Sequence, residues 1–564
     1  MSDESTRRGS EYVYDALVDA GVELLVGLPG TQTLPLDRAV AERDDMRYVM
    51  CRHETAIPHV AWGYHEASGR TAATLTVPGP GDTNAMHGLK NAAEDCVPIL
   101  HVSADADPGD RGKSPIHEIE PDTFDNVVKA NVNVERPMDL REDVARGIEL
   151  AHTPPTGPVR LGVPSGILDS EFAAPEVTVD VEHTEYDTAD GVSRAVELLA
   201  DAERPVIYVG GGARRSPEGV RVVGDLADEL GAPVALSYKG KGVFPEDDPR
   251  FLGVTGSHFP AGASRVLDRA DVVLALGTDF DGVTTAGWEL PMGDSLVHVN
   301  LDPSDIGAAY EADVPIVGDV SAVGDALLDG LGNVGSMDGG PDRWDGAAVA
   351  SSVREEYRES LDARGLFEDG PPLHTPRVLE EVRENTPRDA IVTTDVGGFR
   401  LWSMQLFEAY EPNRFVTAGS WAGMGVGLPA AVGAGLAEPD VPIVCLTGDG
   451  GLLMCIHELH TAAEEDIDLT LVVSNNRDYG VISKSPAIEQ YTEGHRFTWD
   501  TPDYVKIAEG FGCSAVRAGT ASELAEAVAD SVGSSGPTLI DVGVRTDEPS
   551  AAEAAGYDST VELP

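Results

Sequence analysis

The stretch VPIVCLTGDGGLLMCIHELHTAAEEDIDLTLVVSNNRD, from Val441 to Asp478, combines two strand patterns with a helix pattern between them. The apolar run from Val441 to Leu446 predicts a buried parallel strand, and the run from Leu469 to Val473 predicts a second one. Between these runs, apolar residues recur at spacings of three and four from Leu452 to Ala462, which indicates a helix. The stretch therefore predicts a βαβ unit whose first strand ends in the tight turn Thr447–Gly451.

The turn after the first strand has the composition of an anion site. Gly448, Gly450 and Gly451 let the backbone approach a ligand closely, and the amides at the start of a helix favour an anion such as a phosphate. Asp449 lies in the same turn, and a carboxylate beside a phosphate requires a cation between them. Asn476 ends the neighbouring strand and emerges at the same edge of the sheet. These oxygen donors predict a Mg²⁺-diphosphate site, with a plain glycine turn capped by Asp449 as the alternative.

Two short motifs at a fixed spacing also resemble a known family. Gly448-Asp449-Gly450 is followed, 27 positions after Asp449, by the second residue of Asn475-Asn476. This pairing on a strand–helix–strand pattern resembles the signature of thiamine-diphosphate enzymes. The resemblance implies that Asp449 and Asn476 are metal ligands and that the backbone carbonyl of Asp478 completes the protein's share of the ligands.

The length and the charge of the chain limit the number of domains and the kinds of partner to expect. With 564 residues, of which 41% are hydrophobic, several domains with full-sized cores are expected. The chain carries 97 acidic and 40 basic residues, a net charge of −57, and the acids are spread along its whole length. Because a uniformly acidic surface repels nucleic acid and anionic membranes, we expect neither as a partner. Molar salt shortens the Debye length to about 3 Å and screens such self-repulsion, so we expect a halophilic, salt-rich cytoplasm.

The cysteines and the N-terminal residues indicate the cellular compartment in which the protein is expected. The five cysteines, at positions 51, 96, 445, 455 and 513, have no paired spacing, and we interpret them as small core residues in a reducing compartment. The first 21 residues contain no apolar signal region, and no run of 18 apolar residues occurs. We therefore expect a cytoplasmic protein without a membrane span.

The first third of the chain alternates strand and helix patterns, which predicts a parallel sheet with helices on both faces. Glu54 directly follows the strand predicted from Met46 to Cys51, at the edge of the sheet where ligands bind. A first-turn Glu that favours the helix dipole is the alternative interpretation. A further strand predicted from Thr71 to Thr76 ends in a turn that contains Gly79-Pro80-Gly81. The RHE segment ending in Glu54 and the later segment VPGPGDTNAMHGL both resemble the acetolactate synthase and pyruvate decarboxylase group.

We predict two linkers, at about 172–188 and 333–346, because both segments are acidic and rich in Pro or Gly. By the resemblance they separate a pyrimidine-binding domain at 1–172, a middle domain at 189–333 and a diphosphate- and Mg²⁺-binding domain at 372–547. We predict an α/β fold of three doubly wound parallel-sheet domains. Gly210-Gly211-Gly212 follows a strand pattern in the middle domain, but without a full GxGxxG it favours a structural, ligand-free role.

The resemblance covers nearly the whole chain and is greatest to the acetolactate synthase large-subunit group, through the segment AGMGVGLPAAVGAGLAEP at 422–439. It implies a transferase of branched-chain amino-acid biosynthesis, which decarboxylates a 2-oxo acid with thiamine diphosphate and joins the remaining fragment to a second carbonyl. Glu54 would hydrogen-bond the aminopyrimidine ring, and Met424 would support the bent cofactor, with ordinary core packing as the alternative for Met424. The implied cofactor-binding positions are Glu54, Gly79, Gly397, Ala422, Met424, Gly448, Asp449, Gly450, Gly451 and Asn476.

Several positions depart from that group. Asp279-Phe280-Asp281 stands where the resemblance would place an arginine beside FAD, and Gly398-Phe399 replaces a Gln–His pair. No Trp occurs from Tyr479 to Gln490, where the group carries one. His117 takes the place of a glutamine, with a polar loop residue as the alternative interpretation. We therefore expect FAD, which the resemblance alone would imply, to be absent or weakly held.

These departures leave two other functions open. One is a simple 2-oxo acid decarboxylase that releases an aldehyde, with His117 or His53 as the proton donor. The other is a non-catalytic paralogue that keeps the cofactor as a structural element, and the joint presence of Glu54, Asp449 and Asn476 argues against it. The resemblance also implies a homodimer or homotetramer with each cofactor held between subunits, and it leaves a regulatory small subunit open.

Overall fold

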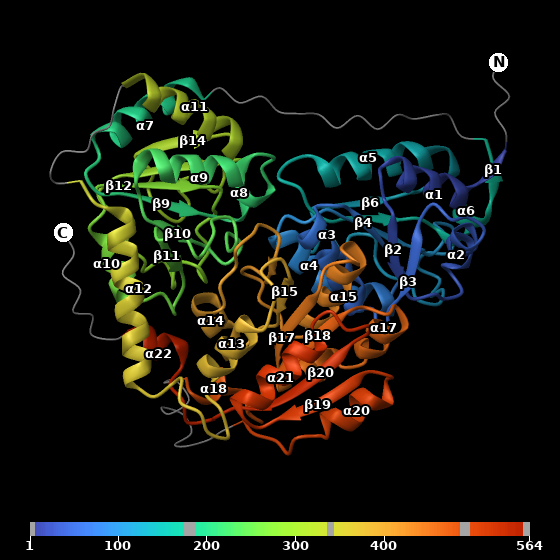
Figure 1. Cartoon of the computed structure of the whole chain (residues 1–564). Coiled ribbons are helices and arrows are strands. Elements are labelled where there is room, and N and C mark those ends of the chain that lie inside the picture. Colours follow the sequence, from blue (N-terminus) through green and yellow to red (C-terminus); the bar gives the residue numbers. More distant parts are fainter. Residues whose placement is uncertain (1–5, 174–187, 335–342, 486–496, 557–564) are drawn as a thin grey trace.

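The computed structural model describes residues 6–173, 188–334, 343–485 and 497–556. Within these residues the chain forms three six-stranded parallel sheets flanked by helices (Figure 1). In Figure 1 the first unit (blue) and the middle unit (green) lie side by side, and the third unit (orange and red) lies below them. The predicted α/β fold of three doubly wound domains is therefore confirmed. The predicted linkers fall largely outside the described residues, and the boundaries 1–172, 189–333 and 372–547 stay predictions.

The first sheet has the strand order β3-β2-β4-β5-β7-β6. Its strands are β2 (Leu24–Gly27), β3 (Arg47–Met50), β4 (Ala72–Thr76), β5 (Ile99–Ser103), β6 (Ala130–Asn133) and β7 (Val159–Gly162). The other elements are β1 (Arg7–Arg8), which pairs with β8 (Glu171–Phe172), and α1 (Gly9–Asp19), α2 (Leu34–Ala41), α3 (Ala56–Ser68), α4 (Pro80–Glu94), η1 (Pro137–Asp139), α5 (Leu140–His152) and α6 (Ser165–Asp169). The chain leaves β2 toward one edge and β4 toward the other, so a crevice opens at the carboxyl ends of these two strands.

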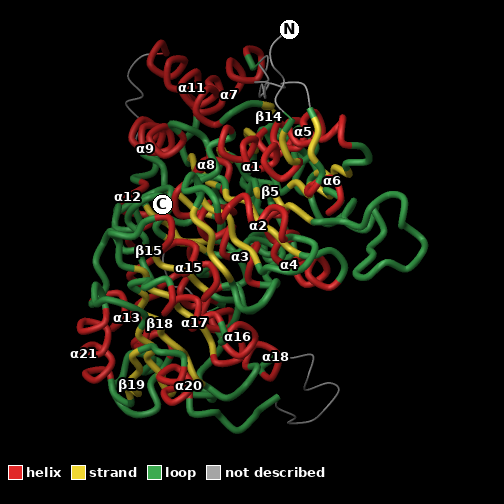
Figure 2. Tube along the Cα trace, turned by 90° about the vertical axis from the view of Figure 1, so that its right-hand side faces the viewer, coloured by secondary structure: helices red, strands yellow, loops and turns green. Residues whose placement is uncertain are grey.

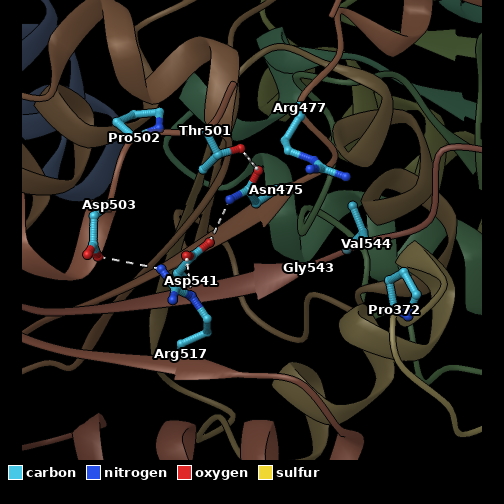
Figure 3. A pocket seen from close by; sticks show the side chains of 10 residues that line it. All are labelled: Pro372, Asn475, Arg477, Thr501, Pro502, Asp503, Arg517, Asp541, Gly543 and Val544. Carbon is cyan, nitrogen blue, oxygen red and sulfur yellow. Dashed lines mark hydrogen bonds and ion pairs between the residues drawn. The ribbon is translucent and has the colours of Figure 1, made fainter. Parts of the chain in front are cut away.

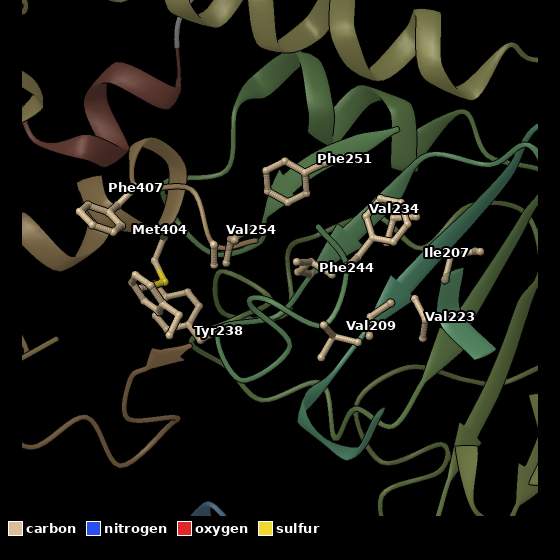
Figure 4. Packing of buried hydrophobic residues seen from close by; sticks show 14 of the residues in the cluster. Ile207, Val209, Val223, Val234, Tyr238, Phe244, Phe251, Val254, Met404 and Phe407 are labelled. Atoms are coloured by element: carbon tan, nitrogen blue, oxygen red, sulfur yellow. The ribbon is translucent and has the colours of Figure 1, made fainter. Parts of the chain in front are cut away.

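The middle sheet has the order β11-β10-β9-β12-β13-β14. Its strands are β9 (Pro205–Val209), β10 (Val234–Leu236), β11 (Phe251–Val254), β12 (Val272–Leu276), β13 (Leu296–Asn300) and β14 (Val314–Val317). Its helices are α7 (Ala189–Asp201), α8 (Gly211–Arg215), α9 (Gly219–Leu230), α10 (Ala261–Asp268) and α11 (Val320–Val334), and α12 (Gly346–Ala363) follows. The apolar core of this unit continues through Tyr238 to Met404 and Phe407 of the third unit (Figure 4), so the two units share one core.

The third sheet has the order β16-β15-β17-β18-β20-β19, the same pattern as the first. Its strands are β15 (Ile391–Thr394), β16 (Phe415–Val416), β17 (Ile443–Gly448), β18 (Leu469–Asn475), β19 (Ser514–Ala518) and β20 (Thr538–Gly543). Its helices are α13 (Thr375–Glu384), α14 (Gly398–Leu406), α15 (Gly427–Ala437), α16 (Asp449–Cys455), α17 (Glu458–Glu464), α18 (Gly480–Ser483), α20 (Tyr504–Gly510), α21 (Ala521–Ser531) and α22 (Ala551–Ala555). Here the crevice opens between β15 and β17.

The predicted βαβ unit is present, with two differences. β17 and β18 pair in parallel as predicted, but β17 runs on to Gly448, which pairs with Ser474. The helix therefore begins at Asp449 instead of after a free turn, which places this carboxylate at the positive end of the helix dipole. The helix is also split, because α16 ends at Cys455 and α17 begins at Glu458.

The predicted turn Gly79-Pro80-Gly81 is also largely helical. α4 begins at Pro80, because proline at the first helical position has a suitable φ and needs no donor. Only Gly79 keeps a positive φ, of 66°. The glycine is required there because few other residues adopt this backbone conformation.

Two helices join the first and third units at close range. A Cβ on Gly63 of α3 would lie 2.3 Å from the carbonyl oxygen of Ala430, and one on Gly433 of α15 would lie 2.0 Å from that of Val60. Turned by 90°, the view in Figure 2 places α4, α16 and α18 toward the same side of the molecule. None of the helices in the described part of the chain combines the length and apolar character needed to cross a bilayer.

Candidate functional site

Asp449 lies at the carboxyl end of β17 as the first residue of α16, with Gly448 as the preceding N-cap residue. Its side chain is buried, 2% exposed, and its Oδ2 accepts the backbone N–H of Arg477 at 3.0 Å. Burial raises the pKa of Asp449 to about 6, and nearby backbone N–H groups only partly offset this effect. A cation beside the carboxylate would favour its charged form, so the environment of Asp449 fits a metal ligand.

The segment after β18 lies against Asp449. Asn476 Oδ1 accepts the backbone N–H of Asp478 at 3.0 Å, and Arg477 between them has a positive φ of 57°. Asp478 is buried, and its carboxylate accepts the hydroxyl of Ser483. The hydrogen bond from the Arg477 N–H to Asp449 Oδ2 therefore holds the loop that carries Asn476 and Asp478 against Asp449. This set has one carboxylate, one amide and one carbonyl, and the described residues hold no cluster of three or more His, Cys, Asp or Glu side chains suited to a metal.

Asn475, the first residue of the asparagine pair, faces a different feature. A pocket of about 400 Å³ opens beside the loop (Figure 3). It is lined by Pro372, Asn475, Arg477, Thr501, Pro502, Asp503, Arg517, Asp541, Gly543 and Val544. Asn475 Nδ2 donates to Asp541 Oδ1 at 2.8 Å, and its Oδ1 accepts the hydroxyl of Thr501 at 3.3 Å. The side-chain amide of Asn475 is therefore hydrogen-bonded within the pocket wall, which leaves Asn476 as the member of the pair beside Asp449.

Asp395 organises the floor of the crevice, although sequence reasoning did not single it out. It directly follows β15, is fully buried, and accepts the backbone N–H groups of Val396 (2.6 Å) and Gly425 (2.9 Å). A Cβ on Gly451 would lie 2.9 Å from Asp395 Cγ, so α16 rests directly on this carboxylate. Its position directly after Ile391-Val392-Thr393-Thr394, a run of β-branched residues, and two residues before Gly397-Gly398 was the available signal.

The remaining predicted positions of the third unit lie at the same edge of the sheet. Gly397 is the N-cap residue of α14, directly after β15. Ala422, with a positive φ of 47°, and the half-buried Met424 lie in the loop between β16 and α15. A Cβ on Gly450 would lie 2.8 Å from the ring of Tyr479, so this glycine allows close packing as well as ligand approach.

A second group gathers on the first unit. Glu54 is half-buried just before α3, and its Oε2 accepts Asn84 Nδ2 at 3.1 Å. His117 has a positive φ of 63°, and its backbone oxygen would lie 2.8 Å from a Cβ on Gly79. Its Nδ1 lies 3.3 Å from Gln32 Nε2. Asn84 and Gln32 are the polar partners that the sequence patterns did not indicate.

The two groups belong to different units. In the described part of the chain, the hydrogen bonds of Glu54 and of Asp449 stay within their own units. The units meet nearby, because the backbone N–H groups of Arg52 and His53 donate to Glu458 Oε1 of α17 at 2.9 and 3.1 Å. Each unit therefore presents one half of the predicted site at the edge of its sheet.

Comparison with protein-family models decides the family. The models described as the N-terminal TPP binding domain, the central domain and the C-terminal TPP binding domain of thiamine pyrophosphate enzymes match residues 7–126, 192–327 and 395–542. The chain belongs to the thiamine pyrophosphate enzyme family. Both half-sites lie within the two TPP-binding matches of this family member. Thiamine pyrophosphate is another name for thiamine diphosphate.

Relatives of this family member match along nearly the whole chain. A probable acetolactate synthase large subunit of Methanocaldococcus jannaschii is 30% identical over 95% of this chain and 91% of its own length. The acetolactate synthase isozyme 2 large subunit of Escherichia coli is 28% identical over 95% of both chains. A probable chloroplastic acetolactate synthase 2 of Oryza sativa is 31% identical over 96% of this chain and 84% of its own length. The predicted resemblance to acetolactate synthase large subunits is confirmed.

Proposed function

We propose that this chain is an acetolactate synthase-like enzyme, which decarboxylates a 2-oxo acid and joins the remaining fragment to a second carbonyl compound with thiamine diphosphate. The observation that carries this proposal is the contact of the Asn476 segment with the buried Asp449 in the crevice beside β17. It lies within a match to a TPP-binding domain, in a chain that resembles acetolactate synthases over nearly its whole length.

Mg²⁺ and the diphosphate would bind at the start of α16. Asp449 and Asn476 would supply side-chain oxygens, and the backbone carbonyl of Asp478 would supply the third protein ligand. Gly448, Gly450 and Gly451 keep side chains away from the start of this helix, where the dipole favours the diphosphate. Gly397, Ala422 and Met424 would line the adjoining part of the crevice.

Glu54 and His117 would act from the first unit. Thiamine diphosphate, when bound here, would supply the nucleophilic carbon and the electron sink that the decarboxylation of a 2-oxo acid requires. Glu54 would hydrogen-bond the aminopyrimidine ring beside Gly79 and hold a proton there. Asn84 orients the Glu54 carboxylate through its 3.1 Å hydrogen bond. His117 lies against Gly79, which supports it as the donor that protonates the fragment when an aldehyde is released, the second candidate function.

We further propose that the site is completed by a second copy of the chain. Exposed apolar side chains border the candidate residues of the third unit; these are Trp421, Leu453, Met454, Tyr479, Val481 and Ile482. Val481 packs beside Gly398, and Met454 beside Gly425. An apolar rim around a polar site favours burial against a partner surface, and the first unit of a second subunit would bring Glu54 to it. The relatives are named as large subunits, which supports a regulatory small subunit as a further partner.

The glycines and carboxylates of the middle unit argue against FAD as a resident cofactor. Gly210 and Gly212 abut the backbone of Gly277, where a Cβ would lie 2.2 and 2.9 Å away, so close packing accounts for these glycines. Burial, together with the nearby carboxylates of Asp281 and Asp305, raises the pKa of Asp279 to about 6. The carboxylates of Asp279 and Asp281, which follow β12, and of Asp305 would repel the diphosphate of FAD. We propose that FAD is absent or weakly held.

Product identification tests the proposed function. The purified protein is incubated in molar KCl with Mg²⁺, thiamine diphosphate and single 2-oxo acids or pairs of them, and products are identified by mass spectrometry. A 2-hydroxy-2-alkyl-3-oxo acid is the expected product. Aldehyde and CO₂ alone would favour the simple decarboxylase. Cofactor binding without turnover of any 2-oxo acid would favour a non-catalytic paralogue.

A further inference from the structure

The loop at 417–425, which connects β16 to α15 and carries Ala422 and Met424, begins at a junction of the three units. Lys239, which follows β10 in the middle unit, donates from Nζ to the carbonyl of Thr417 at 3.1 Å. Arg400 of α14 donates from Nη1 to the carbonyl of Ala418 at 3.0 Å. Both carbonyls belong to buried residues, so the two charged donors replace water as their hydrogen-bond partners where β16 passes into the loop.

The first unit holds the next residue of the loop. Asp95 directly follows α4 and is 3% exposed, and its Oδ1 accepts the backbone N–H of Gly419 at 3.1 Å. Its Oδ2 accepts Lys239 Nζ and Trp62 Nε1, both at 3.0 Å. A Cβ on Gly419 would lie only 2.4 Å from Asp95 Oδ1, so the loop passes directly over the carboxylate. Asp95 and Lys239 thus bind neighbouring backbone groups of the loop, at Gly419 and Thr417, and also form an ion pair with each other.

A buried ion network supports the Asp95–Lys239 pair. Lys239 Nζ also donates to Glu66 Oε2 of α3 at 2.8 Å, and Arg214 and Arg215 of α8 pair with the same carboxylate. Although burial opposes its charge, the surrounding cations hold the pKa of Glu66 well below its usual range. The carboxylate therefore stays charged and holds the ammonium of Lys239 through a third hydrogen bond, besides those to Asp95 and Thr417.

The middle of loop 417–425 also rests on the first unit. A Cβ on Gly423 would lie 2.0 Å from His87 Nε2, and His87 Nδ1 lies 2.7 Å from His59 Nε2. The residues on either side of Gly423 are Ala422 and Met424. A displacement at Gly419 would therefore be transmitted over a few residues to the two side chains proposed to contact the cofactor.

We propose that Asp95 and Lys239 are positioning residues: they set loop 417–425 so that Ala422 and Met424 meet the bound cofactor in the reactive geometry. This inference rests on the proposed function. It differs from a general stabilising role, because it requires a local effect on loop 417–425. It also makes the geometry of the site depend on all three units, since Asp95, Lys239 and the loop each come from a different one.

Lys241 provides a matched control in the same segment. It is fully buried, and its Nζ donates to both oxygens of Glu246 at 2.8 and 2.6 Å and to the carbonyl of Met404 at 3.2 Å. Lys241→Met therefore breaks a buried ion pair, as Lys239→Met does. Lys241 Nζ also lies 4.8 Å from the ring centroid of Phe415 in β16, but its hydrogen bonds go to Glu246 and Met404 and not to the carbonyls of loop 417–425. Loss of one partner of a buried pair is destabilising in both variants.

Hydrogen exchange of the cofactor-free, full-length protein in molar KCl tests whether Asp95 and Lys239 hold loop 417–425 in place. Asp95→Ala and Lys239→Met should speed amide exchange in loop 417–425 by roughly tenfold or more relative to Lys241→Met, with unfolding midpoints measured for all three. Lys239→Arg keeps a donor and should restore much of the protection. If the loop exchanges alike in Lys239→Met and Lys241→Met, the inference is wrong.

Kinetics of the same variants tests the consequence. Misplacement of a positioned group by about 1 Å can lower turnover by roughly 10²-fold, so Lys239→Met should lower kcat by this order with a smaller change in KM. Lys241→Met should keep kcat close to that of the wild type. Equal losses of kcat in the two variants would overturn the inference. An inactive wild type would count against the proposed function alone, because the exchange comparison needs no turnover.

Discussion

Asp449 is the side chain on which metal-dependent binding depends in this proposal. Its buried carboxylate gains a charge partner only when a cation is present, so Asp449→Ala should abolish Mg²⁺-dependent binding of thiamine diphosphate in calorimetry. The control is Asp468→Asn, because Asp468 directly precedes β18 at the opposite end of that strand and accepts the N–H of Gly536. Unchanged affinity in Asp449→Ala would remove Asp449 from the metal site.

Glu54 is predicted to hold a proton for the cofactor without supporting the fold. Glu54→Gln keeps the size of the side chain, so the unfolding midpoint and the affinity for thiamine diphosphate should change little. Turnover should fall by roughly 10²- to 10⁴-fold, the usual range for an acid–base group. The control is Glu94→Gln, which removes a half-exposed ion pair with Lys90 on α4. Near-normal turnover of Glu54→Gln would leave Glu54 as a residue at the start of α3.

Among the elements, α3 and α15 are packed too closely for side chains at their crossing. Gly433→Ala would press a methyl group against the carbonyl of Val60, so we expect a loss of about 1–3 kcal/mol in the free energy of unfolding. Gly224→Ala on α9 is the matched control, because in the described part of the chain no atom beyond its own stretch of helix lies within 4 Å of its Cβ position, and helix propensity should stabilise it by up to about 1 kcal/mol. Denaturant titration in molar KCl measures both. An unchanged midpoint in Gly433→Ala would show that the helices can separate at no cost.

The loops after β9 and β12 lead to a prediction about flavin. Because Gly277 fills the space beside Gly210 and Gly212, and because Asp279 lies close to two other carboxylates, the protein should be purified without flavin. The visible absorbance spectrum, followed by extraction and chromatography of any flavin, is the measurement. Adding FAD should leave the thermal midpoint unchanged, whereas thiamine diphosphate with Mg²⁺ should raise it. Stoichiometric FAD would contradict the repulsion argument.

For the assembled protein, charge links association to salt. Two subunits of net charge −57 repel one another over a Debye length of about 30 Å at 0.01 M salt, but over only about 3 Å at 1 M. We therefore expect a homodimer, or a dimer of dimers, that dissociates and loses activity together as KCl is diluted. Light scattering and activity are measured across one KCl series, with circular dichroism to detect unfolding. A fully active monomer at any salt concentration would refute the shared site.

Much of the architecture followed from short-range patterns in the chain. The strands predicted at 46–51, 71–76 and 469–473 overlap β3, β4 and β18, because buried parallel strands are continuous apolar runs. The spacing from Gly448-Asp449-Gly450 to Asn476 led to the family, which the comparisons confirm. Several strands were not predicted, among them β6, whose sequence ANVN alternates polar residues at the edge of the sheet and carries little apolar signal.

The contacts that assemble the site depend on the packing of the three units. Asp95 and Gly419 are 324 positions apart, and Lys239 and Thr417 are 178 apart, so no local periodicity relates them. Even the start of α16 at Asp449 depends on Gly448 pairing with Ser474 of a neighbouring strand. Such contacts are stabilised by burial in a shared core and by charges held away from water, which exist only once the units have packed. Residue types and their spacing therefore predicted the chemistry of this protein, and the packing of distant segments sets the geometry that positions it.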